Sequence, residues 1–129
     1  DNAYTVTAIK ETIAKTNIGK WQIGEVVNLE RAMIIGARLD GHMIQGHIDQ
    51  VGECFKIDKT NGSWEYTFQY NPSDNLTVEK GSIAVHGISL TVVRSDDNSF
   101  SVAIIPYTYN HTNFQNLTIK PRVYWEMRE

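Results

Sequence analysis

The chain has 129 residues and a mass of 14.7 kDa, enough for one compact domain and little beyond a partial second one. Its net charge of −3 comes from acidic and basic residues mixed along the sequence, so no basic stripe predicts binding to nucleic acid or to an anionic membrane. No stretch approaches the roughly 18 apolar residues of a membrane span, and the polar start lacks a secretory-signal pattern. We therefore expect a cytoplasmic protein, in agreement with its single Cys54, which cannot form an internal disulfide.

Short runs in which apolar and polar residues alternate predict a mostly β domain. Short helices are expected near Glu11–Lys15 and Tyr109–Asn116. Strands are expected over Trp64–Tyr70, Ser82–His86, Leu90–Val93 and Phe100–Ile105, most of them bounded by Gly, Asn, Asp or Pro. Because no long helical segment alternates with each strand, the pattern favours a closed all-β barrel over a doubly wound sheet.

The sequence also matches itself without gaps at a separation of 96 residues, as from Val6 to Val102 and from Ile23 to Ile119. A long period of this kind predicts two copies of a whole domain. We expect residues 1–30 to be the C-terminal part of a first barrel with its linker, and residues 31–129 to form a complete second barrel. The chain would then be a fragment of a longer protein.

Three blocks carry a resemblance to riboflavin synthases. They are VNLERAMIIGARLDGHMIQGHIDQVG from Val27 to Gly52, VEKGSIAVHGISLTVV from Val78 to Val93, and FSVAIIPYTYNHTNF from Phe100 to Phe114. With the N-terminal ETIAKTNIG, the resemblance covers nearly the whole chain. The first block is similar to the family's linker and the first strand of its second barrel.

The resemblance implies six-stranded Greek-key barrels, each binding one 6,7-dimethyl-8-ribityllumazine, in a homotrimer whose facing barrels stack two of these substrates. Such a pair exchanges a four-carbon unit and yields riboflavin and 5-amino-6-ribitylaminopyrimidinedione, without a metal or an organic cofactor. Two other possibilities stay open: a non-catalytic lumazine- or flavin-binding protein of the same fold, and a remnant that binds nothing.

Carried over residue by residue, the family's substrate-contacting positions fall on four stretches and one lysine. In the first-barrel part they are Thr7, Ala8, Ile9, Lys10, Glu11 and Thr12; in the second barrel they are Gly46, His47, Ile48, Lys80, Ser89, Leu90, Thr91, Ile104, Ile105, Pro106, Tyr107, Thr108 and Tyr109. Ser89 and Thr91 are two apart on a predicted strand, so their hydroxyls share one face. Thr108 takes the place that Thr12 holds one repeat earlier.

His47 and Ser89 are the candidate catalytic residues. On a regular strand His47 would share a face with Asp49, which could tune the imidazole for proton transfer near neutral pH, or His47 could simply orient the substrate. His42, five residues earlier, would point to the opposite face, so a zinc site shared by the two histidines is not expected. Lys80 is as well explained by a solvated turn as by a substrate contact.

Three positions depart from the pattern of the family. His86 stands where an Asp precedes Gly-Ile-Ser, while Tyr124 and Arg128 stand where the last strand often has Asn and Asp. Loss of a carboxylate there puts an acid–base or ribityl-binding role of that strand in doubt. The family's trimerisation helix would lie beyond Glu129.

Overall fold

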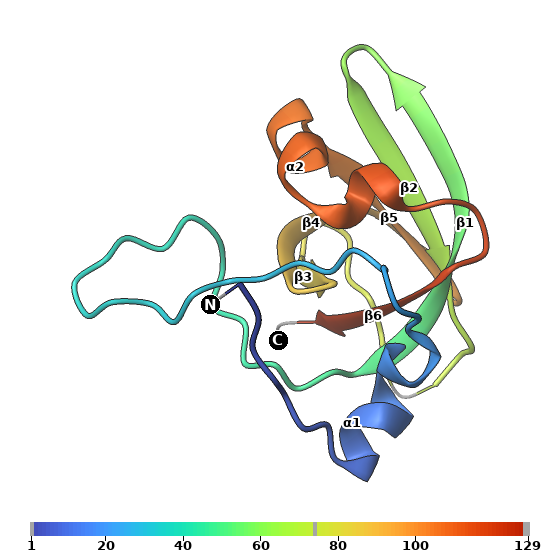
Figure 1. The fold of residues 1–129 in the computed structure, drawn as a ribbon. Coiled ribbons are helices and arrows are strands. Elements are labelled where there is room, and N and C mark those ends of the chain that lie inside the picture. The colour runs from blue at the N-terminus through green and yellow to red at the C-terminus, as the bar shows by residue number, and fades with distance from the viewer. Residues whose placement is uncertain (1, 74, 128–129) are drawn as a thin grey trace.

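The computed structural model describes residues 2–73 and 75–127, and within them six antiparallel strands close into a barrel (Figure 1). The barrel order is β1-β2-β5-β4-β3-β6, with β6 pairing back onto β1. The strands are β1 (Gln50–Thr60), β2 (Ser63–Gln69), β3 (Ser82–Val85), β4 (Ile88–Ser95), β5 (Ser99–Ile104) and β6 (Arg122–Met127). The consecutive strands β3, β4 and β5 lie side by side, with β2 returning next to β5, which is a Greek key. The predicted fold is thus confirmed.

Two hairpins of this barrel are closed by two-residue turns. Asn61 and Gly62 join β1 to β2, and His86 and Gly87 join β3 to β4, all four with φ between 44° and 82°. Two successive positive φ values are typical of the type I′ turn, whose twist matches that of the strands. The strand expected to reach His86 therefore ends at Val85, because His86 adopts the left-handed conformation of the turn.

Large apolar side chains fill the barrel from alternate positions of the strands. On β5, Phe100, Val102 and Ile104 are buried, and on β2 Tyr66 and Phe68 face them. The rings of Phe68 and Phe100 lie 5.3 Å apart between centroids. Alternation in the sequence therefore marks the core correctly.

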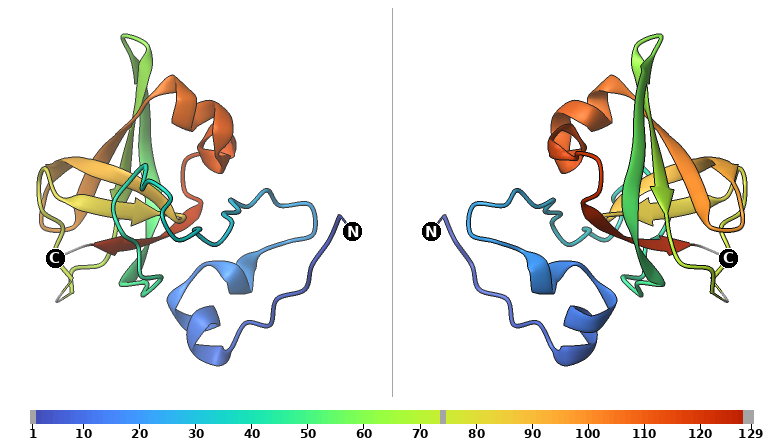
Figure 2. Two further views of the ribbon diagram at one scale, coloured as in Figure 1. Left: turned by 90° about the vertical axis from the view of Figure 1, so that its left-hand side faces the viewer. Right: turned by 90° about the vertical axis from the view of Figure 1, so that its right-hand side faces the viewer.

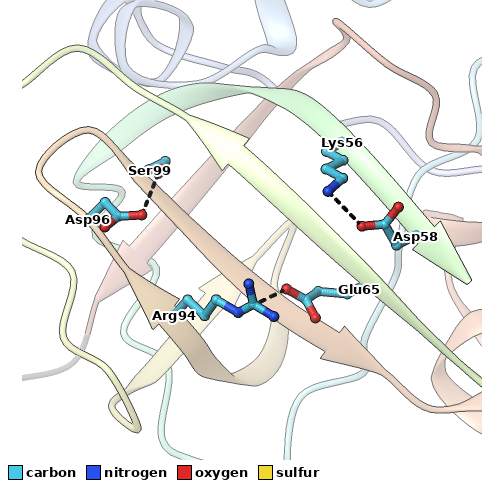
Figure 3. Close-up of polar contacts among 6 residues, drawn as sticks. All are labelled: Lys56, Asp58, Glu65, Arg94, Asp96 and Ser99. Atoms are coloured by element: carbon cyan, nitrogen blue, oxygen red, sulfur yellow. Dashed lines mark hydrogen bonds and ion pairs between the residues drawn. The ribbon is translucent and has the colours of Figure 1, made fainter. Parts of the chain in front are cut away.

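Ion pairs lie on the outer side of the barrel strands (Figure 3). Arg94 of β4 reaches Glu65 of β2 across the intervening β5, with 3.6 Å between Nε and Oε1. Lys56 and Asp58 pair at 3.1 Å along β1. The side chains of Lys56 and Arg94 are mostly exposed and those of Asp58 and Glu65 partly so, and pairs this open to solvent each contribute little to stability. They keep this face hydrated and leave the core to hold the barrel together.

Four short helices are α1 (Lys10–Lys15), η1 (Ile18–Lys20), α2 (Pro106–His111) and η2 (Asn113–Asn116). The helix expected over Tyr109–Asn116 is in fact two, starting at Pro106 and interrupted at Thr112, whose backbone is extended (φ −134°, ψ 174°). Proline suits the first position of a helix because its missing N–H has no partner there anyway. The bounds of α1 and α2 differ by the same 96 residues as the sequence match.

Residues 2–49 lie outside the barrel as a mostly irregular segment that carries α1 and η1 along one side of it (Figure 2). Tyr4, Val6 and Leu29 are exposed there, although their counterparts 96 residues later, Phe100, Val102 and Trp125, are buried in the barrel. The division into two domains at residue 30 stays a prediction.

Among the described residues, no helix is both long and apolar enough to cross a membrane.

Candidate functional site

Ser89 lies near the start of β4 on the outer face of the barrel. In the register of the sheet it is opposite Ala84 of β3, which is in turn opposite Glu126 of β6. The side chain of the next residue, Leu90, packs against the core, so Ser89 and Thr91 share the outer face as expected. Ser89 therefore projects from the outer face at this end of the barrel.

The irregular stretch at residues 41–49 crosses this face and brings His42 onto Ser89. The Ser89 hydroxyl oxygen accepts the backbone N–H of His42 at 3.0 Å and lies 2.6 Å from its Nδ1. When Nδ1 carries no hydrogen, the Ser89 hydroxyl donates to it, and His42 is then the proton acceptor for Ser89. A Cβ at Gly41 would lie 2.6 Å from the Ser89 hydroxyl, so the approach requires glycine.

The expectation that His42, His47 and Asp49 lie on a regular strand is wrong. β1 begins only at Gln50, and Gly46 has φ +76°, so strand alternation does not apply before Gln50. Asp49 is engaged elsewhere, since its Oδ2 accepts the backbone N–H of Met127 at 2.6 Å. From the sequence, His42 was considered only as a possible metal ligand, and its pairing with Ser89 was not predicted. The repeated Gly-His at Gly41 and Gly46 was the available signal.

His47 lies instead in a cleft between residues 41–49 and helix α1. The cleft has a volume of about 440 Å³ and is open to solvent on one side. It is lined by Ile9, Glu11, Thr12, Lys15, Thr16, Gly46, His47 and Ile48. The structure therefore groups Gly46, His47 and Ile48 with Ile9, Glu11 and Thr12, which were predicted to belong to a first barrel. The sequence had led us to expect Gly46, His47 and Ile48 beside Ser89.

Residues Ile104 to Tyr109 follow β5 at the Ser89 end of the barrel. The start of β4 and the end of β5 lie at the same end of an antiparallel pair, which places Ile104 and the following Ile105 near Ser89. The Ile104 side chain is buried in the core, so only its backbone is free to meet a ligand, whereas Ile105 and Tyr107 are exposed. Pro106, Thr108 and Tyr109 lie on α2, where Tyr109 stacks on Trp64 with centroids 3.9 Å apart.

Lys80 is exposed and has a left-handed backbone (φ +64°) that is fixed by its N–H donating to the Val92 carbonyl at 2.8 Å. No contact of its ammonium group within the described residues distinguishes a solvated turn lysine from a lysine that contacts the substrate. Thr7, Ala8 and Lys10 lie beside the α1 cleft without lining it.

Among residues 2–73 and 75–127, no three His, Cys, Asp or Glu side chains are grouped closely enough to hold a metal ion. Cys54 of β1 is almost fully buried, and this burial raises the pKa of its thiol to about 11. The thiol is thus protonated and enclosed near neutral pH.

Comparison with known proteins decides the family. Residues 1–32 and 45–128 match the model of the lumazine binding domain. The chain belongs to the lumazine-binding domain family. Its relatives include riboflavin synthase of Actinobacillus pleuropneumoniae, 43% identical over 87% of this chain and 53% of that protein, and riboflavin synthase of Bacillus subtilis strain 168, 36% identical over 95% and 57%. The chain spans about half the length of these relatives.

A solved structure supports the same fold for this family member. The crystal structure of LumP complexed with 6,7-dimethyl-8-(1'-D-ribityl) lumazine superposes with a TM-score of 0.82 over 94% of this chain and 66% of that one. The identity is 21%, so the likeness concerns the fold.

The departures from the family pattern meet on one side of this lumazine-binding domain. The rings of His86 and Tyr124 lie 4.9 Å apart between centroids, in the seam where residues 17–28 contact the barrel. Burial lowers the pKa of His86 and raises that of Tyr124, so both rings are held neutral near pH 7. Arg128 lies outside the described residues.

Proposed function

We propose that the protein to which this chain belongs is a riboflavin synthase, which converts two molecules of 6,7-dimethyl-8-ribityllumazine into riboflavin and 5-amino-6-ribitylaminopyrimidinedione. The observation that carries the proposal is the Ser89–His42 pair, set on the outer face of a barrel of the lumazine-binding family. The relatives named riboflavin synthase support the same reaction.

In the proposed reaction the chain has two tasks, to orient the lumazine and to move protons. The C7 methyl group of the lumazine is acidic because its carbanion is delocalised over the ring, so a modest base suffices. Ser89 Oγ would take the proton from the C7 methyl group while its own hydroxyl proton passes to unprotonated His42 Nδ1, 2.6 Å away. Orientation would contribute the larger part, up to roughly 7–11 kcal/mol in ideal intramolecular models.

The surroundings of Ser89 suit a planar heterocycle with a polyhydroxyl arm. Backbone groups near the end of β5 would pair with one edge of the ring, since Ile104 offers only its backbone. The hydroxyls of Thr91 and Thr108 would meet the ribityl arm, because a hydroxyl both donates and accepts hydrogen bonds. The residues Ser89, Leu90, Thr91 and Ile104 to Tyr109 form the proposed binding set of this barrel.

The α1 cleft is proposed as part of a second lumazine site. Three of its lining residues, Ile9, Glu11 and Thr12, are the counterparts of Ile105, Tyr107 and Thr108 one repeat later. His47 would then serve this second site. The matching bounds of α1 and α2 support the internal repeat on which this assignment rests. We also propose a cytoplasmic homotrimer, in which such sites of neighbouring subunits face each other.

A non-catalytic lumazine- or flavin-binding protein is the second candidate. His86 and Tyr124 favour it, because the carboxylate and amide of the family pattern are absent from the seam. The fold of LumP, solved with the same ribityllumazine, also accommodates such a function. Both candidates predict binding, and only riboflavin formation distinguishes them.

The deciding experiment combines a binding titration with an assay of riboflavin formation. We expect the 129-residue chain to bind 6,7-dimethyl-8-ribityllumazine while turning it over slowly, and the full-length protein to form riboflavin. Ser89→Ala and Thr108→Ala should each weaken binding by about 0.5–1.5 kcal/mol, the usual contribution of a neutral hydrogen bond. Binding by the full-length protein without riboflavin would support the second candidate, and unchanged affinity in both variants would remove these residues from the site.

A further inference from the structure

Asn28 fastens the N-terminal segment to the barrel through two backbone groups. Its Oδ1 accepts the backbone N–H of Asn113 at 2.8 Å, and its Nδ2 donates to the carbonyl of His86 at 3.1 Å. A backbone N–H only donates and a carbonyl only accepts, so these contacts fix which end of the Asn28 amide is oxygen.

The orientation of Asn28 in turn fixes that of the Asn113 side chain. The Nδ2 of Asn28 also donates to Asn113 Oδ1 at 2.9 Å, which turns the Asn113 NH₂ group toward the imidazole of His86. Asn113 Nδ2 lies 3.2 Å from His86 Nδ1. Because an NH₂ group in this contact offers hydrogens, Nδ1 must be the unprotonated nitrogen and the ring hydrogen must be on Nε2.

We propose that His86 is a pH-sensitive latch, which holds residues 17–28 against the barrel while its imidazole is neutral and loosens them when the ring becomes cationic. Protonation puts a hydrogen on Nδ1 directly opposite the Asn113 NH₂ group. Asn113 cannot turn its oxygen toward His86 without giving up its bond from Asn28. The strain of two facing donors is therefore transmitted to the contact that fastens the segment.

The groups around His86 determine whether docking is favoured at high or at low pH. The carboxylate of Glu25, in the docked segment, faces His86. The Tyr124 ring and the Arg122 carbonyl face His86 from β6, and Asn113 faces it from η2. Burial is the largest influence and lowers the pKa of His86, while the Arg122 carbonyl and Glu25 oppose it more weakly. A depressed pKa in the docked state means that docking is favoured above the ordinary histidine pKa of about 6.5 and is lost as the pH falls.

The segment has a second attachment to the barrel besides Asn28. Residues 17–28 follow α1 directly, and Asn17 gives them a second attachment by donating to the Arg122 carbonyl at 2.9 Å. Loosening at Asn28 would leave that attachment in place, so the segment would loosen without being released.

The test compares the wild-type chain with His86→Asn. Asparagine tolerates the φ of +51° at this turn, and its Oδ1 can accept from Asn113 where Nδ1 does, yet it has no proton to gain between pH 5 and 8. The readout is hydrogen exchange of the Asn113 amide, corrected for the intrinsic pH dependence of exchange, since Asn28 Oδ1 protects this amide.

We expect protection of the Asn113 amide to fall about tenfold in the wild type between pH 7.5 and 5, and to stay within about threefold in His86→Asn. An equal fall in both proteins, or no fall in either, would overturn the proposal. A second measurement needs only the wild type: ¹⁵N shifts of the His86 ring at pH 8 should show the hydrogen on Nε2. Finding it on Nδ1 would contradict the latch whether or not the variant folds.

Discussion

At the scale of single residues, the pairing of Ser89 with His42 is the feature that most shapes the proposed chemistry. The sequence predicted Ser89 and its outward direction, because alternation on a strand follows from the pleat. It did not predict the partner, because His42 reaches Ser89 from residues 41–49, whose irregular path depends on Gly41 and Gly46. A loop of this kind leaves no periodic trace in the sequence.

The Ser89–His42 pair predicts a coupling that a double-mutant cycle can measure. On binding of the ribityllumazine, Ser89→Ala and His42→Ala together should cost less than the sum of the two single changes, with a difference of about 0.5–1.5 kcal/mol. Ser99→Ala, at the opposite end of β5, is the matched control and should leave affinity unchanged. Strict additivity of the two changes would show that the pair does not act as a unit at the ligand.

Cys54 gives a second prediction at this scale. Its burial and its pKa of about 11 should make the folded chain resist thiol reagents at pH 8, while the chain unfolded in urea reacts at the ordinary rate. Because the folded pKa lies above the ordinary value of 9.0, this thiol favours folding below pH 9, and its contribution declines as the pH rises toward 11. Rapid stoichiometric labelling of the folded chain would contradict the described burial.

At the scale of elements, the strands were predictable and the segments between them were less so. Alternating apolar residues located β2 and β5 to within one or two residues, since both strands pack one face on the core. The helix expected over Tyr109–Asn116 was misplaced because the signal of Pro106 at a helix start was overlooked. β1 was expected too early, because residues 41–49 lie on the barrel surface without joining its ladder of hydrogen bonds.

Phe68 and Phe55, on neighbouring strands, provide a matched test of this packing. Phe68 is fully buried, whereas Phe55 is 54% exposed. Phe68→Ala should lower the free energy of unfolding by about 3–5 kcal/mol, because it leaves a cavity beside Phe100 and Phe114. Phe55→Ala should cost much less, within about 1 kcal/mol. Urea unfolding followed by circular dichroism measures both, and similar losses would contradict the assignment of inner and outer faces.

At the scale of the whole molecule, the sequence predicted the closed Greek-key barrel and the family, whereas the structure revealed how the first 49 residues attach to it. The apolar side chains of Tyr4, Val6 and Leu29 are exposed here while their counterparts form a core. Sequence repetition could indicate this equivalence, but it could not place the segment, because its attachments are single polar contacts such as those of Asn17, Asn28 and His42. Isolated polar contacts of this kind produce no periodic pattern of residue types in the sequence, so the sequence does not predict them.

The central claim is that the outer face at Ser89 binds a ribityllumazine. It is tested most directly by titrating the 129-residue chain with 6,7-dimethyl-8-ribityllumazine, following ligand fluorescence and the amide resonances of the chain together. We expect a saturable change in fluorescence, with the largest shifts at His42, Ser89 and Thr91 and none at Ser99. No change in fluorescence, or saturable shifts that leave Ser89 unaffected, would contradict the account.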